Sequence, residues 1–424
     1  MQLSPARRSL ALFTLALGGF GIGTTEFATM GILPLAAGEL VPIFEADPAG
    51  GIAQAGWMIT AYALGVVVGA PLVSVWAARL SQRTLVLLLA AAFTVTNLAS
   101  ALMPSFELTI AARFVAGLPH GAYFGVAALL AARIMGPGRQ GAGVALALSG
   151  LTIANIIGVP LGTWLGQVAG WRWTYVAVAV IFAITLLMAW LVLPHVPGDP
   201  TRSARNELRA FRNPKLWLMV AVGCIGFGGF FAVYSYAAEI VTRVAELPLS
   251  AVAWLLATIG VGMTIGNAIG GWAADRSIRR TILIAFPLLI LSLGLFAMLG
   301  SQPVAMFVLA FLIGAMGSVL NPTIQARIMR IAGEAELLGA ATNHAAFNVG
   351  NALGAALGGA VIAAGLGYLA PAWIGVGLAG AGLLLALWSL AIDREQPDTA
   401  AQPIVATVLG PTTAGIEVID RERG

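Results

Sequence analysis

Residues 18–34 read GGFGIGTTEFATMGILP and place one carboxyl group, that of Glu26, inside a long apolar run. The run extends from about residue 10 to about residue 35, which is long enough to cross a bilayer as a helix. An ionisable side chain there costs about 2.5–3.5 kcal/mol on the mildest insertion scale and marks a functional site by default. Glu26 is the only acidic residue that the pattern places clearly inside a membrane helix. We predict that it faces a water-filled cavity and carries a proton, a substrate contact, or both; the alternative is a structural carboxylate neutralised by an arginine.

The rest of the chain is equally apolar. Of its 424 residues, 59% are hydrophobic and 9% are charged, against about 45–50% and about 25% in soluble domains. This composition predicts an all-α polytopic protein of the bacterial inner membrane, in contact with the lipid bilayer. The net charge of +4 comes from basic residues in loops, so we expect no nucleic-acid partner.

The chemistry that the sequence excludes narrows the function. The single lysine, Lys215, does not belong to a G-x-x-x-x-G-K-[ST] loop, so any uphill work would draw on an ion gradient or a partner ATPase. There is no G-x-S-x-G elbow and no H-E-x-x-H motif, and the three histidines lack metal-ligand spacing. We therefore expect neither an enzyme nor a bound metal or cofactor.

Apolar runs of about 20 residues recur along the chain, as membrane-spanning helices require. We predict twelve, near residues 10–35, 52–76, 84–103, 107–131, 140–166, 171–193, 215–239, 250–274, 281–300, 303–326, 337–364 and 366–391. With both termini in the cytoplasm, 19 of the 22 Lys and Arg residues fall in cytoplasmic segments. Arg172 and Arg243 fall in outer segments, and Arg113 falls inside a helix. This bias follows the positive-inside rule and supports the topology.

The two halves of the chain repeat one another. Motifs recur about 197 residues apart: Gly65-x-x-x-Gly69 as Gly262-x-x-x-Gly266, and Asn155-x-x-Gly158 as Asn351-x-x-Gly354. Each half holds six helices, so the copies have the same orientation and would place a site between them near the membrane midplane. We predict a six-helix bundle at 1–193, a cytoplasmic loop at 194–214, a second bundle at 215–392 and a disordered cytoplasmic tail at 393–424.

Arg113 is a second charge inside the membrane. It shares one face of the run 107–131 with Gly117 and His120, at i, i+4 and i+7. Arg113 lies about six residues, or ~9 Å, from the outer end of its helix, and Glu26 lies about nine residues, or ~14 Å, from its own. The depths agree, so we predict a Glu26–Arg113 pair, direct or through water, with Glu26, Arg113 and His120 as the proton-coupling group. The alternatives are that Arg113 binds backbone carbonyls and that His120 only packs its helix.

Uncharged polar side chains supply candidate substrate contacts. His344, Asn348 and Asn351 form an i, i+4, i+7 stripe on one helix face. The stripe either forms hydrogen bonds with neighbouring helices or lines a cavity and contacts the substrate. The other candidates for the cavity are Thr29, Asn155, Tyr234 and Asn321.

The twelve helices, the parallel halves and the central loop resemble the major facilitator superfamily over about residues 10–392. The loop Asp275-Arg276-Ser277-Ile278-Arg279-Arg280 is similar to the family's cytoplasmic D-R-x-G-R-R signature, with Ile in place of Gly. Its first-half counterpart contains Arg79 and Arg83 but lacks the Asp and the Gly. The resemblance implies a role for these residues in gating the cytoplasmic side.

Two helix motifs extend the resemblance. Arg113 with Gly117 and Gly121 resembles the R-x-x-x-G motif, whose arginine is implicated in proton coupling. The string Gly158-Val159-Pro160-Leu161-Gly162-Thr163 resembles the antiporter motif G-P-x-x-G-G, with the proline shifted by one residue. Gly158, Pro160 and Gly162 are therefore implied gating residues.

A closer resemblance is to the AraJ-like arabinose-efflux group of the twelve-helix drug:proton antiporters. It is carried by EF at 26–27 with MG at 30–31, YALGVVVGAP at 62–71, PHGA at 119–122, GVPLGT at 158–163 and ELLGAA at 336–341. The resemblance implies proton-coupled export of a small sugar-like or drug-like solute. We expect alternating access and a monomer. The alternatives are facilitated uniport, sugar:proton symport, and a receptor or scaffold without flux.

Overall fold

The described part of the chain folds almost entirely into helices. The computed structural model describes residues 4–77, 80–136, 140–195, 213–332 and 336–392. The first half contains α1 (Pro5–Leu40), η1 (Pro42–Phe44), α2 (Pro48–Ala55), α3 (Trp57–Ala77), α4 (Gln82–Leu102), α5 (Phe106–Gly117), α6 (His120–Met135), α7 (Gln140–Ile153), η2 (Ala154–Gly158), α8 (Val159–Ala169) and α9 (Trp171–Val192). The second half contains α11 (Pro214–Tyr234), α12 (Ala237–Glu239), η4 (Ile240–Val244), α13 (Ala251–Leu299), α14 (Pro303–Ala332), α15 (Glu336–Ala363) and α16 (Ala370–Ile392).

Polar residues at the ends of the apolar runs start the helices. Ser81 accepts a hydrogen bond from the backbone N–H of Thr84 at 3.1 Å, and Asn213 accepts one from Lys215 at 3.0 Å. Each side chain satisfies a backbone donor that has no partner in the first turn of a helix. The helices therefore begin close to where the apolar runs begin.

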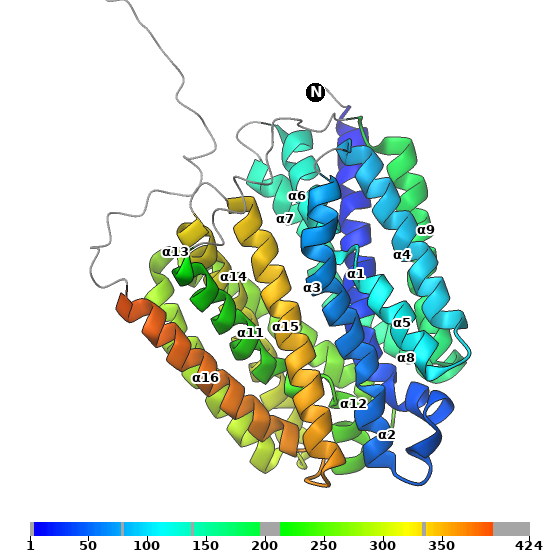
Figure 1. The fold of residues 1–424 in the computed structure, drawn as a ribbon, viewed down its shortest axis with the longest axis vertical. Helices are drawn as coiled ribbons and strands as arrows, with labels where there is room; N and C mark the ends of the chain where they lie inside the picture. Colours follow the sequence, from blue (N-terminus) through cyan, green and yellow to red (C-terminus); the bar gives the residue numbers. More distant parts are fainter. Residues whose placement is uncertain (1–3, 78–79, 137–139, 196–212, 333–335, 393–424) are drawn as a thin grey trace, which may run out of the picture.

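The prediction of twelve spans is confirmed once α13 is divided. Eleven helices among the described residues are long and apolar enough to cross a membrane, and one of them is the 49-residue α13. At 1.5 Å per residue, α13 would be about 74 Å long, more than twice the thickness of the hydrocarbon core. It leaves helical geometry at Ser277, where φ is −166° and ψ is 100°. Counting the parts before and after Ser277 separately gives twelve, arranged as two bundles (Figure 1).

Four predicted helices are interrupted, one of them the run 215–239, which is broken at Ser235 and Tyr236 between α11 and α12. The run 107–131 is divided into α5 and α6 at Leu118 and Pro119, because the proline ring cannot continue the hydrogen-bond ladder of the preceding turn. The run 140–166 contains the π-turn η2 before Pro160, and the run 52–76 is broken at Gly56. The breaks at Pro119 and in η2 lie next to polar residues that the sequence singles out, His120 and Asn155.

The two faces of the protein differ in how the bundles meet. We call the face that carries loops 41–47, 103–105, 245–250, 300–302 and 364–369 the distal face, and the face at the start of α1 the proximal face (Figure 1). One apolar cluster is built from both bundles, and its first-bundle members begin at Phe27 and continue toward the distal face. A separate cluster fills the proximal half of the first bundle alone, around Tyr123 and Phe182. The bundles are therefore joined in the distal half of the membrane.

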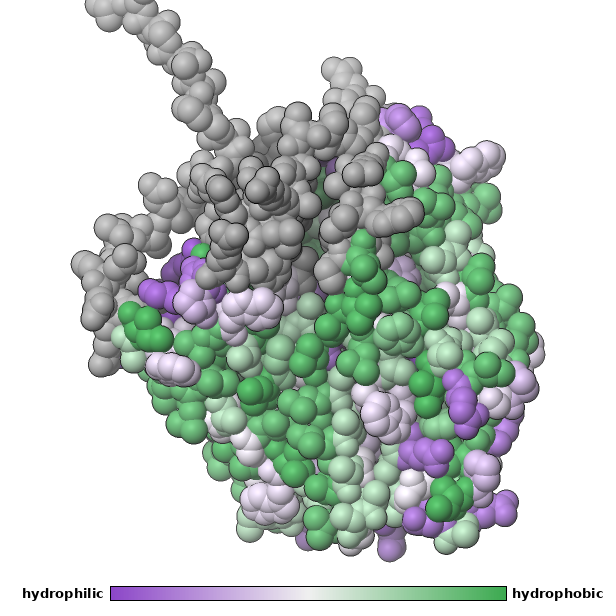
Figure 2. All heavy atoms as spheres, viewed as in Figure 1, coloured by the Kyte–Doolittle hydropathy of each residue, from purple (hydrophilic) through white to green (hydrophobic). Residues whose placement is uncertain are grey.

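The face drawn in Figure 2 is largely apolar, with polar side chains gathered at the upper right and along the lower right. Several large apolar side chains are exposed, for example Leu384 at 68%, Trp254 at 71% and Val304 at 79%. Exposed apolar groups on this scale are what a lipid-facing surface requires. The structure thus has the surface of an integral membrane protein.

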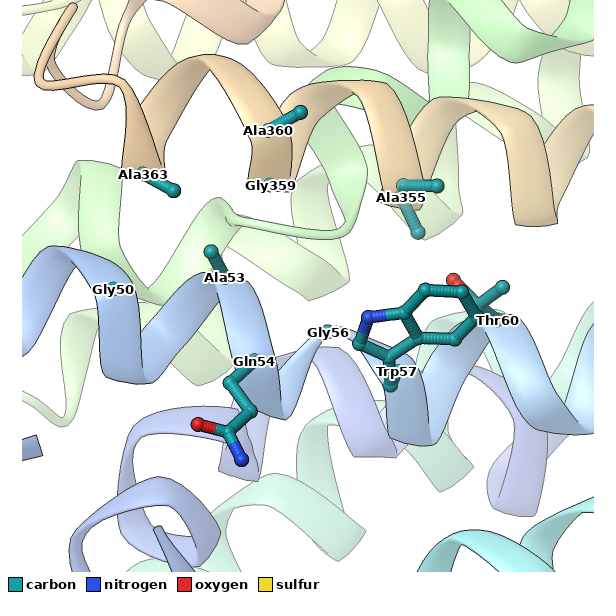
Figure 3. Close-up of a pocket in the computed structure, with 11 residues that line it drawn as sticks. Gly50, Ala53, Gln54, Gly56, Trp57, Thr60, Ala355, Gly359, Ala360 and Ala363 are labelled. Carbon is teal, nitrogen blue, oxygen red and sulfur yellow. The ribbon is translucent and has the colours of Figure 1, made fainter. Parts of the chain in front are cut away.

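A cavity of about 370 Å³ remains between the bundles near the distal face. It lies between α15 and the α2–α3 segment, and Trp57 and Thr60 line it beside a row of alanines and glycines (Figure 3). No ionisable side chain lines this cavity, and none of the predicted site residues does.

Candidate transport site

Helix α1 positions Glu26 in the interior of the protein. Every residue from 21 to 33 is buried, and the Glu26 side chain is 4% exposed. Gly31 allows this close packing: a side chain there would overlap Thr163 of the first bundle and lie 2.7 Å from Leu256 of the second. Since both bundles contact α1, Glu26 lies where they meet.

Arg113 is buried completely and is held by neutral groups. Its guanidinium donates to the Thr25 hydroxyl and to the Thr25 carbonyl, both at 3.0 Å. It lies over the rings of Tyr62 and Tyr175, at 4.4 and 4.9 Å from their centroids. Aromatic faces stabilise a desolvated guanidinium by up to about 2 kcal/mol. Two hydrogen bonds and two rings thus compensate for the burial of this charge.

The predicted Glu26–Arg113 pair is not a direct contact in the structure, and a pair through water stays a prediction. Arg113 binds Thr25, the residue before Glu26, and successive residues on a helix point about 100° apart. The two side chains lie close enough for their charges to interact, but their partners differ. The spacing along each helix predicts that the two residues lie at a similar depth, but it does not determine the direction in which each side chain points.

Glu26 contacts one basic residue and one amide instead. His120 Nδ1 lies 3.9 Å from Glu26 Oε2, and Asn351 Nδ2 donates to Glu26 Oε1 at 3.3 Å. The hydroxyl of Tyr62 is hydrogen-bonded to the same His120 nitrogen at 3.1 Å. Tyr62 therefore connects Arg113, which stacks on its ring, with His120.

The Glu26–Asn351 contact joins the two bundles, and aromatic contacts surround it. Phe27 packs against Phe231 and Tyr234 of α11, with ring centroids 6.3 and 5.6 Å apart. On the proximal side, Phe124 stacks on His344 of α15 at 5.5 Å and 8°, and also contacts His120 at 5.3 Å. The site therefore consists of a carboxyl group, two imidazoles and an amide, enclosed by aromatic rings from both halves of the chain.

The other predicted substrate contacts have varied surroundings. Thr29 donates to the carbonyl of Thr25 at 3.0 Å and lies 2.9 Å from the Tyr175 hydroxyl, so it supports the Arg113 group. Asn321 accepts a hydrogen bond from Asn343 at 2.9 Å. Asn155 is 5% exposed, and its amide oxygen has no hydrogen-bond partner. The hydroxyl group of Tyr234 also has none.

The residues of the loop signatures lie on the proximal face. Asp275, Arg276, Arg279 and Arg280 are exposed around the Ser277 break, and Arg276 stacks on Trp272 at 3.7 Å. Arg83 donates to the carbonyl of Trp190. Arg79 lies outside the described residues.

The residues of the predicted antiporter motif, 158–163, lie against α1. Pro160 follows η2, and side chains at Gly158 and Gly162 would press on Thr24 and Ala28. These glycines allow η2 and α8 to pack closely on the helix that carries Glu26.

A second buried carboxyl group, Glu239, was missed. Its side chain is 1% exposed and forms an ion pair with Arg243, with Nε and Oε2 2.5 Å apart. The predicted helix ended at residue 239, but the π-turn η4 continues it to Val244 and brings Arg243 within reach. The i, i+4 spacing of Glu239 and Arg243 was the available signal. Glu26 is therefore not the only acidic residue inside a membrane helix.

The aromatic residues around the buried charges were also missed. Tyr62, Tyr175 and Phe124 belong to apolar runs, where aromatic side chains usually signal core packing or interface anchors. Their role follows from tertiary contacts, for which the sequence contains no local signal.

Comparison with known proteins identifies the family. A model of the Major Facilitator Superfamily matches residues 15–253 and again residues 235–411. The chain belongs to the Major Facilitator Superfamily. The double match confirms the internal repeat and the family resemblance of the sequence motifs.

The similar proteins include a transport protein of the inner membrane. The inner membrane transport protein YdhP of Escherichia coli K12 is 38% identical over 92% of this chain and 97% of its own length. AraJ of Escherichia coli K12 is 34% identical over 84% of this chain and 89% of its own. A chloramphenicol resistance protein of Streptomyces lividans is 33% identical over 94% of this chain and 99% of its own. The crystal structure of a D-xylose-proton symporter has the same fold, with a TM-score of 0.70 at 14% identity over 90% of this chain and 96% of that chain.

Proposed function

We propose that this protein is a proton-coupled antiporter that exports a small sugar-like or drug-like solute across the bacterial inner membrane by alternating access. Glu26 carries the proton, and Arg113 and His120 adjust the field around it. YdhP is described as an inner membrane protein, and the Streptomyces relative by resistance to chloramphenicol, which supports location and export. The protein acts as a monomer.

One observation carries the proposal: the Glu26 carboxyl group accepts a hydrogen bond from the opposite bundle. Asn351 Nδ2 donates to Glu26 Oε1 at 3.3 Å across the interface. An amide donates a stronger hydrogen bond to an ionised carboxylate than to a neutral carboxylic acid. Protonation of Glu26 therefore weakens a contact between the two bodies that must move relative to one another.

The cycle follows from this contact. With Glu26 ionised, its bond to Asn351 favours the closed distal half seen here, and solute enters from the proximal side. Bound solute shifts the population toward the state that is open distally, where a proton from the distal side neutralises Glu26 and displaces the solute. The protonated protein then returns, and the proton leaves on the proximal side. The membrane potential contributes about 2.3 kcal/mol per charge per 100 mV to the return of the proton.

The proximal face is cytoplasmic in this proposal, as the arginine distribution predicts. The residues that act in gating at that face are Arg79, Arg83, Asp275, Arg276, Arg279 and Arg280. Gly158, Pro160 and Gly162 allow η2 and α8 to move against α1. The bundles span 1–193 and 215–392 and are joined by the loop 194–214, with a tail at 393–424. The proposed substrate contacts are Thr29, Asn155, Tyr234, Asn321, His344, Asn348 and Asn351.

Transport by purified protein in proteoliposomes tests the proposal. An imposed pH gradient should drive uphill movement of radiolabelled chloramphenicol or arabinose by the natural protein. Glu26→Gln should stop uphill movement and keep solute exchange at equal concentrations, because the amide cannot release a proton. Glu39→Gln is the matched control: Glu39 lies on the same helix, half exposed, and pairs with Arg172 at 2.8 Å. Uphill transport by Glu26→Gln at the normal rate would remove Glu26 from the coupling role.

A further inference from the structure

The asparagines of α15 present their oxygens to the site. Asn348 and Asn351 are 1% and 0% exposed. The amide nitrogen of Asn348 donates to the His344 carbonyl at 3.0 Å, and that of Asn351 donates to Glu26 at 3.3 Å. In both residues the amide oxygen has no hydrogen-bond partner.

The hydrogen bonds donated by the amide nitrogens of Asn348 and Asn351 fix the orientation of the two amide groups. Rotating either amide by half a turn would break its N–H bond and place an oxygen against another oxygen. Both residues therefore offer an acceptor. A buried oxygen without a partner costs about as much as a lost hydrogen bond, and an unpaired group of this kind in a folded protein requires a reason.

These acceptors lie together with the Glu26 carboxyl group. Asn348 is one turn from His344 and one turn from Asn351 on the same helix. His344 stacks on Phe124, and Asn351 binds Glu26, so Asn348 lies between these two levels of the bundle interface. The Tyr234 hydroxyl, also without a partner, is carried by a ring 5.6 Å from Phe27, the residue after Glu26.

We infer that the site takes a neutral solute that combines an apolar face with several hydroxyl groups, and that Asn348 and Asn351 recognise those hydroxyl groups as hydrogen-bond donors. The aromatic rings of Phe27, Phe231 and Tyr234 supply the surface for the apolar face. Since this inference names the solute of the proposed antiporter, it rests on the proposed function.

The charge balance favours a neutral solute over a cation. The carboxylate of Glu26 is already opposed by the guanidinium of Arg113, whose charge acts on it. A buried cation without an uncompensated negative charge would lose its hydration and gain too little in return. Hydroxyl donors carry no such cost.

The arrangement also explains why proton and solute compete. An ionised Glu26 can only accept, so it holds Asn351 with the nitrogen toward the carboxylate and the oxygen toward the solute. A protonated Glu26 can donate to the Asn351 oxygen, and the amide then turns its N–H₂ group toward the solute. Protonation thus replaces an acceptor by a donor and rejects a donor-rich solute.

A matched pair of ligands tests the inference without a gradient. The full-length protein is purified in detergent, and binding is followed by the thermal stability of its tryptophan fluorescence. The probes are phenyl β-D-glucopyranoside and its tetra-O-methyl ether, which keeps the ring and the oxygens and has no donor; benzyltrimethylammonium represents a cation. We expect the glucoside to bind at least about tenfold more tightly than the ether or the cation, and more tightly at pH 8 than at pH 5.

Variants assign the preference to residues. Asn348→Leu and Asn351→Leu should each weaken glucoside binding by about two- to tenfold, the effect of one neutral hydrogen bond, and leave binding of the ether unchanged. Ser292→Ala, which removes a buried hydroxyl bonded to its own helix in α13, should change neither. Equal binding of the glucoside and the ether by the natural protein, whether tight or absent, would overturn the inference. That result leaves the antiport test untouched, because uphill transport is measured separately and with other solutes.

Discussion

Replacement of Arg243 by alanine should open the distal face more often. The guanidinium of Arg243 lies 6.0 Å from the ring centroid of Phe44 and 5.8 Å from that of Tyr368. Tyr368 and Glu239 belong to the second bundle, as Arg243 does, so those contacts persist when the bundles separate. Phe44 belongs to the first bundle, and its contact with Arg243 is broken. Of these contacts of Arg243, the one with Phe44 biases the equilibrium between the closed and open distal face.

The size of the effect follows from the exposure of Arg243. Its side chain is 39% exposed, and a cation–π contact at an exposed site is worth about 0.5–1 kcal/mol. Losing it should increase the open population about two- to fivefold, since 1.4 kcal/mol corresponds to a factor of ten.

The assay is the rate of cysteine labelling in detergent. Cys224, the only native cysteine, is replaced by serine, and a cysteine is introduced at Ala355, which is 1% exposed and lines the distal cavity (Figure 3). When opening and closing are fast relative to the reaction, the rate with a maleimide reports the open fraction. Arg243→Ala should raise this rate about two- to fivefold.

Two further variants separate the cation–π contact from a general loss of stability. Phe44→Leu leaves the Glu239–Arg243 ion pair in place and should raise the rate by the same factor as Arg243→Ala. Arg172→Ala removes an ion pair near the same face, but one made with Glu39 inside the first bundle, and should have no effect. An unchanged rate in Arg243→Ala, or an equal increase in Arg172→Ala, would refute the reasoning.

Two other substitutions probe the interface and the buried charge. Gly260→Ala should raise the same labelling rate at least about fivefold. The new methyl group would overlap the backbone oxygen of Asn155 in the other bundle, and overpacking of this kind costs about 1–3 kcal/mol. Gly271→Ala is the control and should not change the rate, because there is open space around Gly271. Arg113→Lys should lower the unfolding free energy by about 1–3 kcal/mol, because one of two hydrogen bonds to Thr25 is lost; an unchanged midpoint of thermal unfolding in detergent would contradict this.

The number and order of the helices could be predicted because the bilayer imposes them. A span needs about 20 apolar residues, and a break between spans needs charge or turn residues, so each leaves a local record in the chain. Ser277 shows the limit of this record: α13 continues through the signature loop almost as one helix, and only the position of the arginines separates its two spans. Which face is cytoplasmic stays a prediction.

The partners of the site residues could not be predicted in the same way. Residue spacing gives the depth of Glu26 and Arg113, and both do lie in one layer. The rotation of each helix about its axis depends on packing with helices that are distant in the sequence. Asn351 is 325 residues from Glu26, and no local pattern relates them. Polar stripes indicated which α15 side chains face the interior, and the structure shows which of them reaches the carboxyl group.

The separation of Arg113 from Glu26 has a consequence for coupling. A guanidinium bound directly to Glu26 would keep the carboxylate ionised and would move with each change in protonation. Arg113 is instead anchored to Thr25 and to the rings of Tyr62 and Tyr175. Its positive charge thus acts on Glu26 as a constant background. The contact that changes with the proton is then the one with Asn351, which belongs to the other bundle, so the energy of protonation is applied to the interface that has to open.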